Sequence, residues 1–143
     1  MTPIAPLPPI SISAFSEEVE TYHLLLKVAA DPRMSRVQMQ VDLGGVTAAR
    51  EALASAPTPN LIIIESSDER EILLEKLDAL AEVCDPGSKV VAIGAVNDIM
   101  LYRELMERGV SEYIVHPFSP SDLVRLIAGL YANPSQRLVG RVI

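Results

Sequence analysis

The chain is poor in the residues that build disulfide frameworks and metal sites. Tryptophan is absent, cysteine occurs once and only 2 histidines are present among 143 residues. The single Cys84 excludes an internal disulfide and is compatible with a reducing compartment. Because the two histidines also lie far apart in the sequence, the composition argues against a zinc site.

Positive charge and long apolar runs are scarce as well. The 12 Lys and Arg are outnumbered by 19 Asp and Glu, which gives a net charge of −7. This balance argues against a nucleic-acid partner, and the scattered basic residues form no patch for anionic lipids. No apolar run has the length of a membrane span, and residues 1–10 (MTPIAPLPPI) lack the basic start of a signal peptide. We therefore expect a cytoplasmic protein that is not inserted into the membrane.

Aliphatic residues make up the core, because 49% of the residues are hydrophobic and only 4% are aromatic. Apolar runs and alternations predict strands at residues 10–15, 37–41, 61–65, 90–94 and 112–115. Capping and stop signals predict a helix that begins after Ser16 as N-cap and ends at Asp31-Pro32. Four more helices are predicted over residues 46–54, 71–83, 98–108 and 119–132. Five alternating β–α units in one chain of this length predict a single α/β domain, a three-layer sandwich with a parallel sheet.

One acidic residue occupies a special place in this pattern. Residues 61–64 are four consecutive apolar residues, typical of a strand covered on both faces, and Glu65 follows them directly. The carboxyl ends of parallel strands border the ligand crevice of an open sheet. We therefore expect Glu65 at the place where this protein would carry out any chemistry.

Two segments resemble the receiver domains of two-component systems. Residues 59–65 (PNLIIIE) are similar to the third receiver strand, and residues 108–123 (RGVSEYIVHPFSPSDL) to the region from the end of the fourth helix to the start of the fifth. The resemblance covers residues 9–132 and implies the flavodoxin-like, CheY-like fold with a five-stranded parallel sheet in the order 2-1-3-4-5. It also implies a cis peptide bond between His116 and Pro117 and a switch-like aromatic residue at Tyr113.

The residues that carry the receiver reaction are replaced in this chain. Glu65 stands where the phospho-accepting aspartate belongs, and Ala14 and Phe15 stand where the magnesium-binding acids belong. Gly94 replaces the hydroxyl residue and His116 replaces the lysine. A displaced carboxylate and a poorly held metal remove most of what accelerates phosphoryl transfer. The resemblance therefore implies a non-enzymatic domain without catalytic, cofactor-binding or metal-binding residues.

Individual residues keep alternative interpretations at this point. Glu65 is either a permanent charge that imitates a phosphorylated aspartate, or a strand-end carboxylate that caps a nearby helix or meets water. Glu17 and Glu18 are either a displaced acidic pair or acids that complement a helix dipole. Tyr113 is either a frozen switch or a packed aromatic, and His116 is more typical of a spacer before proline than of a ligand or base. A flavin site is a further alternative, but the acidic, glycine-free segment 15–18 (FSEE) would repel a phosphate.

A narrower resemblance concerns residues 56–65 (APTPNLIIIE), 80–94 (LAEVCDPGSKVVAIG) and 96–106 (VNDIMLYRELM). These segments resemble the amino-terminal region of CpaE/TadZ pilus-assembly proteins, in which an atypical receiver domain precedes a MinD/ParA-type ATPase domain. The resemblance implies an extended leader at 1–8, the receiver-like domain at 9–133, and at 134–143 a linker with the start of a truncated ATPase domain. The start of the ATPase domain is inferred from residues 137–143 (RLVGRVI), which resemble the linker and first strand of such a domain and contain no phosphate-binding loop.

The same resemblance implies a function. We expect a phosphorylation-independent protein-interaction domain that acts in the assembly or polar localisation of the Tad (Flp) pilus secretion machinery. Its partners are then proteins of that machinery, which recruit it to the inner membrane or the cell pole. The alternative is a phospho-accepting receiver domain of a two-component signalling system.

The last two predicted helices contain more apolar residues than one buried face can take. We expect some of these residues on the surface, as an interface. Receivers commonly dimerise through the fourth helix, fifth strand and fifth helix, which implies a homodimer or a docking site on that face. The candidate interface residues are Met100, Leu101, Tyr102, Leu123 and Ile127.

Overall fold

The computed structural model describes residues 7–131. Five strands alternate with five α-helices, and a short 3-10 helix, η1, follows the first of them. None of the helices in this range is both long and apolar enough to cross a membrane. The elements are β1 (Ser11–Ser16), α1 (Val19–Ala29), η1 (Pro32–Met34), β2 (Gln38–Leu43), α2 (Val46–Leu53), β3 (Leu61–Glu65), α3 (Arg70–Ala81), β4 (Lys89–Gly94), α4 (Ile99–Glu107), β5 (Glu112–Val115) and α5 (Pro120–Leu130).

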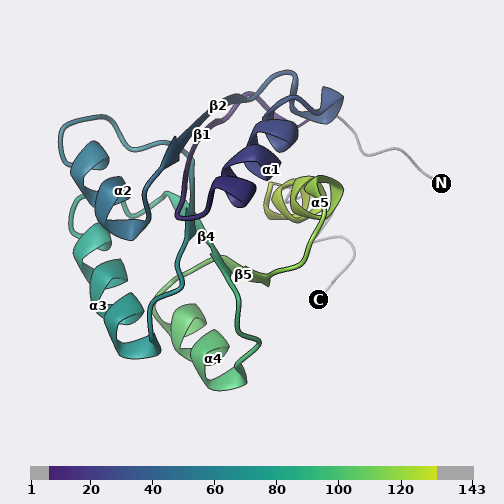
Figure 1. The fold of residues 1–143 in the computed structure, drawn as a ribbon. Coiled ribbons are helices and arrows are strands. Elements are labelled where there is room, and N and C mark those ends of the chain that lie inside the picture. The colour runs from purple at the N-terminus through teal and green to yellow at the C-terminus, as the bar shows by residue number, and fades with distance from the viewer. Residues whose placement is uncertain (1–6, 132–143) are drawn as a thin grey trace, which may run out of the picture.

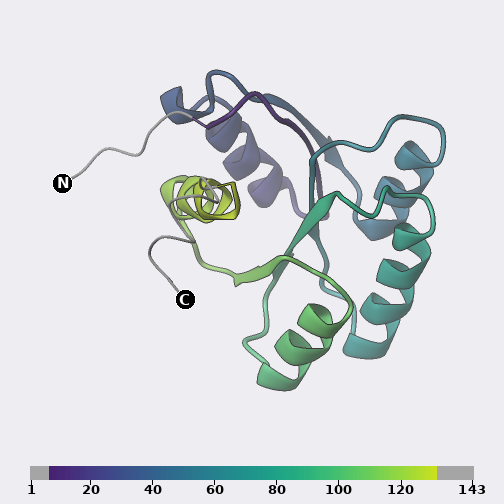
Figure 2. The same ribbon diagram turned by 180° about the vertical axis from the view of Figure 1, so that it is seen from behind.

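All strand pairs of the sheet are parallel, and the strand order is β2-β1-β3-β4-β5. Helices α1 and α5 cover one face of the sheet, and α2, α3 and α4 cover the other (Figures 1 and 2). The predicted three-layer, flavodoxin-like architecture is confirmed.

The central strand β3 is buried on both faces, as its apolar run predicts. Ile62 and Ile64 pack in the core formed with α2, α3 and α4, whereas Leu61 and Ile63 pack in the core formed with α1 and α5. All four side chains are 0% exposed. Burial of one such side chain contributes roughly 1.5–3 kcal/mol to the stability of the fold. Strand β3 therefore stabilises the cores on both faces of the sheet.

The start of the domain differs from the prediction at two places. Ser16 is the last residue of β1, and its buried Oγ has no hydrogen-bond partner among the described residues, so it does not cap α1. Leu7 is buried in the core with α1 and α5, and its N–H donates to the carbonyl of Arg33 at 3.1 Å. The packed domain therefore reaches into the expected leader 1–8. The rest of that leader, 1–6, and the expected ATPase linker at 134–143 lie outside the described residues.

Local signals fix the ends of α4 and α5. Gly109 follows the last turn of α4 with φ of +93°, a left-handed conformation that favours glycine. Ser119 and Asp122 form a capping box at the start of α5, in which each side chain accepts the backbone N–H of the other residue. Just before this box, the peptide bond between His116 and Pro117 is cis, as predicted.

The candidate interface residues do not all lie on the surface. Met100 and Tyr102 are exposed, at 55% and 40%. The prediction was wrong for the other three, because Leu101 packs in the core with α2 and α3, and Leu123 and Ile127 pack in the core with α1 and α5. Part of the large number of apolar residues in α4 and α5 is therefore buried in the two cores.

Candidate functional site

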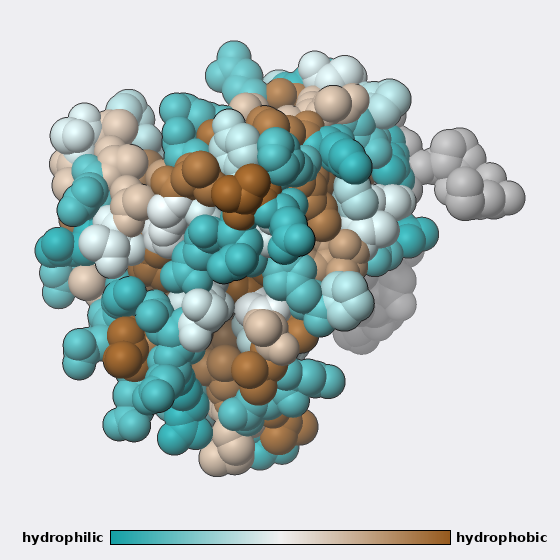
Figure 3. Space-filling model, in the orientation of Figure 1, coloured by the Kyte–Doolittle hydropathy of each residue, from teal (hydrophilic) through white to brown (hydrophobic). Residues whose placement is uncertain are grey.

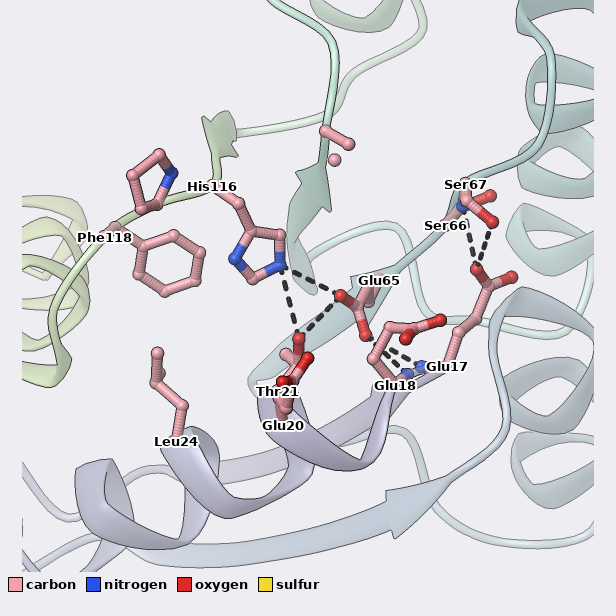
Figure 4. A pocket seen from close by; sticks show the side chains of 13 residues that line it. Glu17, Glu18, Glu20, Thr21, Leu24, Glu65, Ser66, Ser67, His116 and Phe118 are labelled. Atoms are coloured by element: carbon pink, nitrogen blue, oxygen red, sulfur yellow. Dashed lines mark hydrogen bonds and ion pairs between the residues drawn. The ribbon is translucent and has the colours of Figure 1, made fainter.

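A crevice opens at the carboxyl edge of the sheet, between the loops that follow β1, β3, β4 and β5 (Figure 4). Its volume is about 500 Å³. It is lined by the first turns of α1 and by these four loops, with Glu17, Glu18, Glu20, Thr21, Leu24, Glu65, Ser66, Ser67, Gly94, Ala95, His116, Pro117 and Phe118. The edge and the residue at its centre, Glu65, are those that the sequence predicts.

Both oxygens of Glu65 are occupied by the protein itself. Oε1 accepts the backbone N–H groups of Glu17 and Glu18, at 2.9 and 3.0 Å. Oε2 accepts the Thr21 hydroxyl at 2.6 Å and lies 2.9 Å from Nε2 of His116. No side chain caps α1 from its own N-cap position, so Glu65 supplies the acceptor for the amides that lead into this helix. This geometry agrees with the capping interpretation of Glu65.

Glu65 is ionised at neutral pH although it is only 4% exposed. Burial raises the pKa of its carboxyl, but the hydrogen bonds from the Glu18 amide, Thr21, His116 and the Glu17 amide together outweigh burial. The pKa of Glu65 therefore lies below its usual value of 4.5. The negative charge of Glu65 is held by oriented donors within the protein.

His116 is more than a spacer before proline. Its Nε2 lies 2.9 Å from Oε2 of Glu65 and 3.2 Å from Oγ1 of Thr21. Its ring stacks on Phe118, with the two centroids 4.9 Å apart. The side chain that replaces the receiver lysine thus binds the side chain that replaces the receiver aspartate (Figure 4).

Glu17 completes a reciprocal exchange between two loops. Its Oε1 accepts the backbone N–H of Ser67 at 2.8 Å and the hydroxyl of the same residue at 2.9 Å. The loop after β1 therefore donates to Glu65 at the end of β3, and the loop after β3 donates to Glu17. Glu18 is exposed. Within residues 7–131, no three His, Cys, Asp or Glu side chains come together to hold a metal ion.

The two β1 positions at which the receiver resemblance led us to expect an acidic pair are packed inside the protein. Ala14 is 0% exposed in the core with α1 and α5, and Phe15 is 3% exposed in the core with α2 and α3. Neither residue lines the crevice. The side chains of Ala14 and Phe15 therefore contribute packing to the two cores.

Gly94, at the end of β4, makes room for Tyr113 of β5. A Cβ atom at position 94 would lie 2.8 Å from Cε1 of Tyr113, closer than side chains pack. The Tyr113 hydroxyl donates to the carbonyl of Val96 at 2.8 Å, and burial raises the pKa of the phenol. Tyr113 therefore takes the space that a hydroxyl-bearing residue at position 94 would need.

Sequence reasoning missed Thr21, Ser67 and Phe118, which hold Glu65, Glu17 and His116 in place. Only Thr21 carried a usable signal. It lies one helical turn after the loop that faces Glu65, where a hydroxyl can reach the same carboxylate as the loop amides. Ser67 and Phe118 have no local pattern that distinguishes them from ordinary loop residues.

The fold and the crevice define a class of protein. It is a receiver-like domain in whose crevice Glu65 and His116 bind each other. A response regulator from Thermotoga maritima shares this fold at a TM-score of 0.69 and 19% identity, covering 89% of this chain and 100% of that chain.

Two more similar structures give the family. The crystal structure of the pilus assembly protein CpaE from Caulobacter crescentus is 49% identical, with a TM-score of 0.87, and covers 90% of this chain and 98% of that chain. A putative CpaE2 pilus assembly protein from Sinorhizobium meliloti is 36% identical, with a TM-score of 0.78, and covers 82% and 96%. No family model and no curated protein matches the sequence. The chain belongs to the CpaE family of pilus assembly proteins.

Proposed function

We propose that this chain is a non-catalytic, phosphorylation-independent protein-interaction domain that acts in the assembly of a pilus. The observation that carries the proposal is the saturation of Glu65. Its two oxygens have four partners, two backbone amides, one hydroxyl and one imidazole. A carboxylate held in this way acts as a structural acceptor, and attack on a phosphoryl group would break contacts that organise the start of α1.

The neighbouring positions support the same conclusion. Phosphoryl transfer depends on positioning and on cations that stabilise the developing charge. Ala14 and Phe15 are packed in the two cores, and Gly94 offers no hydroxyl. His116 occupies the lysine position but is engaged with Glu65 at 2.9 Å. These contacts support a crevice in which Glu65 and His116 are engaged with each other rather than with a phosphoryl group.

The family supports the biological setting, because the two relatives are pilus assembly proteins by name. We propose that the partners of this chain are proteins of the pilus secretion machinery, and that they recruit it to the inner membrane or to a cell pole. A homodimer through α4, β5 and α5 is a second proposal for the same setting. It rests on Met100 and Tyr102, which are exposed on α4.

Phosphorylation by a small donor tests the central claim. The chain is incubated with acetyl phosphate and Mg²⁺, beside an ordinary receiver domain as positive control, and both intact masses are measured. We expect the receiver to gain one phosphoryl group and this chain to keep its mass, and we expect the same for Glu65→Asp because the metal site is still missing. A gain of one phosphoryl group that disappears in Glu65→Ala would show a phospho-accepting receiver instead.

A further inference from the structure

The exposed apolar side chains are concentrated at one edge of the molecule. Eight large apolar side chains are exposed within residues 7–131. All but Leu26 belong to the last residue of a strand, to a loop between a strand and the next helix, or to the first four residues of a helix. In a parallel sheet these places lie together at the carboxyl edge, around the crevice. Val96 and Ile99 are the most exposed of them, at 60% and 65%.

This arrangement is visible on the surface. Apolar side chains gather over α4, in the lower part of Figure 3, beside the hydrophilic side chains of its neighbours. Val96 follows directly after Ala95, which lines the crevice, so this apolar surface adjoins the crevice. Exposed apolar patches on the rim of a cavity mark places where a partner binds.

The crevice combines an apolar wall with an acidic rim. Leu24, Pro117 and Phe118 form the wall. Three carboxylates line the same crevice, those of Glu17, Glu18 and Glu20, and none of the ion pairs among the described residues involves them. No Lys or Arg lines the crevice. A cleft lined by charges of one sign concentrates ligands of the opposite sign.

These properties select between possible occupants. A phosphate group would meet only negative charges at the rim. A divalent metal ion would find no cluster of three ligands within the described part of the chain. An arginine or lysine side chain needs no such cluster, because its methylene stem can lie on an apolar wall while its charged end reaches carboxylates at the rim.

We propose that the crevice and the apolar side chains around it form a docking groove for a basic, apolar segment of a partner protein. An arginine or lysine of that segment pairs with Glu18 and Glu20, and its stem lies against Leu24 and Phe118. Apolar residues that flank the basic one cover Val96, Ile99 and the start of α4. The proposal rests on the proposed function, because it requires a crevice that is free of phosphoryl chemistry.

The test is a titration of the full ¹⁵N-labelled chain with a synthetic probe, followed by NMR. The probe is a peptide of about 12 residues in which arginines alternate with pairs of leucines, a length of roughly 40 Å in extended form. One control peptide has glutamine in place of each arginine, and a second has serine in place of each leucine. We expect saturable shifts of the amides at residues 17–21, 66–67, 94–99 and 116–118 with the probe, and much weaker binding of both controls.

Two double variants with equal net charge distinguish attraction of the peptide to the crevice from attraction to the overall negative charge of the chain. Glu18→Gln with Glu20→Gln should weaken binding about fivefold, in line with the modest contribution of exposed charge pairs. Glu51→Gln with Glu82→Gln removes two exposed carboxylates elsewhere and should leave the affinity unchanged. Equal weakening by the two pairs, or equal binding of the serine control peptide, would overturn the proposal.

A second copy of the chain is the competing occupant. Concentration-dependent shifts of the same amides without any peptide would identify it and would also overturn the proposal. The mass measurement with acetyl phosphate tests Glu65, and the titration tests the groove. A failure of the docking proposal is therefore distinguishable from a failure of the proposed function.

Discussion

Replacement of Glu65 by alanine should remove a large part of the stability of this domain. The change deletes the acceptor of four hydrogen bonds, from the Glu17 and Glu18 amides, Thr21 and His116. A hydrogen bond to a charged group contributes roughly 1.5–3 kcal/mol, but groups that face the crevice can bind water after the change. Only the Thr21 hydroxyl is deeply buried, on a residue that is 2% exposed.

We therefore expect Glu65→Ala to lower the free energy of unfolding by about 3 kcal/mol, a large share of the ~5–15 kcal/mol typical of a domain. Glu65→Gln keeps the size of the side chain and one carbonyl oxygen, and loses the charge. Since charge-assisted hydrogen bonds are roughly twice as strong as neutral ones, we expect a smaller loss of about 1 kcal/mol.

Urea unfolding at pH 7, followed by far-UV circular dichroism, measures both changes, because the chain has no tryptophan to serve as a fluorescent reporter. Glu51→Ala is the matched control. Glu51 is exposed on α2 and forms no ion pair among the described residues, so its loss should change stability by at most about 0.5 kcal/mol. If Glu65→Ala unfolds at the same urea concentration as the unchanged chain or at a higher one, the burial of the charge outweighs its hydrogen bonds, and the capping role is refuted.

Three further predictions concern pH, Gly94 and Met100. The unchanged chain should be more stable than Glu65→Gln above about pH 4.5, and this advantage should disappear as the pH falls through the lowered pKa of Glu65, because protonation removes the accepting charge. The urea midpoints of both chains are measured at successive pH values. A difference between the two midpoints that does not change with pH would contradict this prediction. Gly94→Thr should destabilise the domain by about 2 kcal/mol, because the new side chain meets the ring of Tyr113, and the added change Tyr113→Ala should reduce that loss when the double variant is unfolded in urea. Met100→Glu should leave the unfolding transition unchanged, because Met100 is 55% exposed, and should abolish the proposed homodimer in sedimentation; an unchanged chain that sediments as a monomer would remove the dimer proposal.

The fold was predictable because its signals are local. The apolar run of β3 and the alternation of strands with capped helices specify the layers, and the strand order follows from the receiver resemblance. The start of α1 was not predictable in the same way. Ser16 has the side chain of an N-cap, but the acceptor for the amides that lead into α1 is Glu65, which lies 48 residues after Glu17 in the chain. A distant acceptor leaves no mark on the local sequence, so only the structure identifies it.

The candidate site shows the same limit. The sequence alone singled out Glu65 and the carboxyl edge of the sheet, and both belong to the crevice. The contacts that the crevice residues make could not be predicted from the sequence, because each contact joins two residues that are distant in the chain. Gly94 leaves room for the ring of Tyr113, and His116 binds the carboxylate of Glu65. The apolar excess of α4 and α5 was equally ambiguous, because periodicity alone did not distinguish the buried Leu101 from its exposed neighbours.

The close fit of Tyr113 against Gly94 has an evolutionary consequence. A mutation that placed a threonine or serine at position 94 would make that side chain collide with the tyrosine ring, so it would lower the stability of the domain. Loss of the tyrosine alone would leave a void beside the glycine and would also be selected against. A lineage could acquire a hydroxyl at position 94 only by changing both positions together, or by first accumulating spare stability elsewhere. The contact with Tyr113 therefore makes the glycine at position 94 easier to keep than to replace.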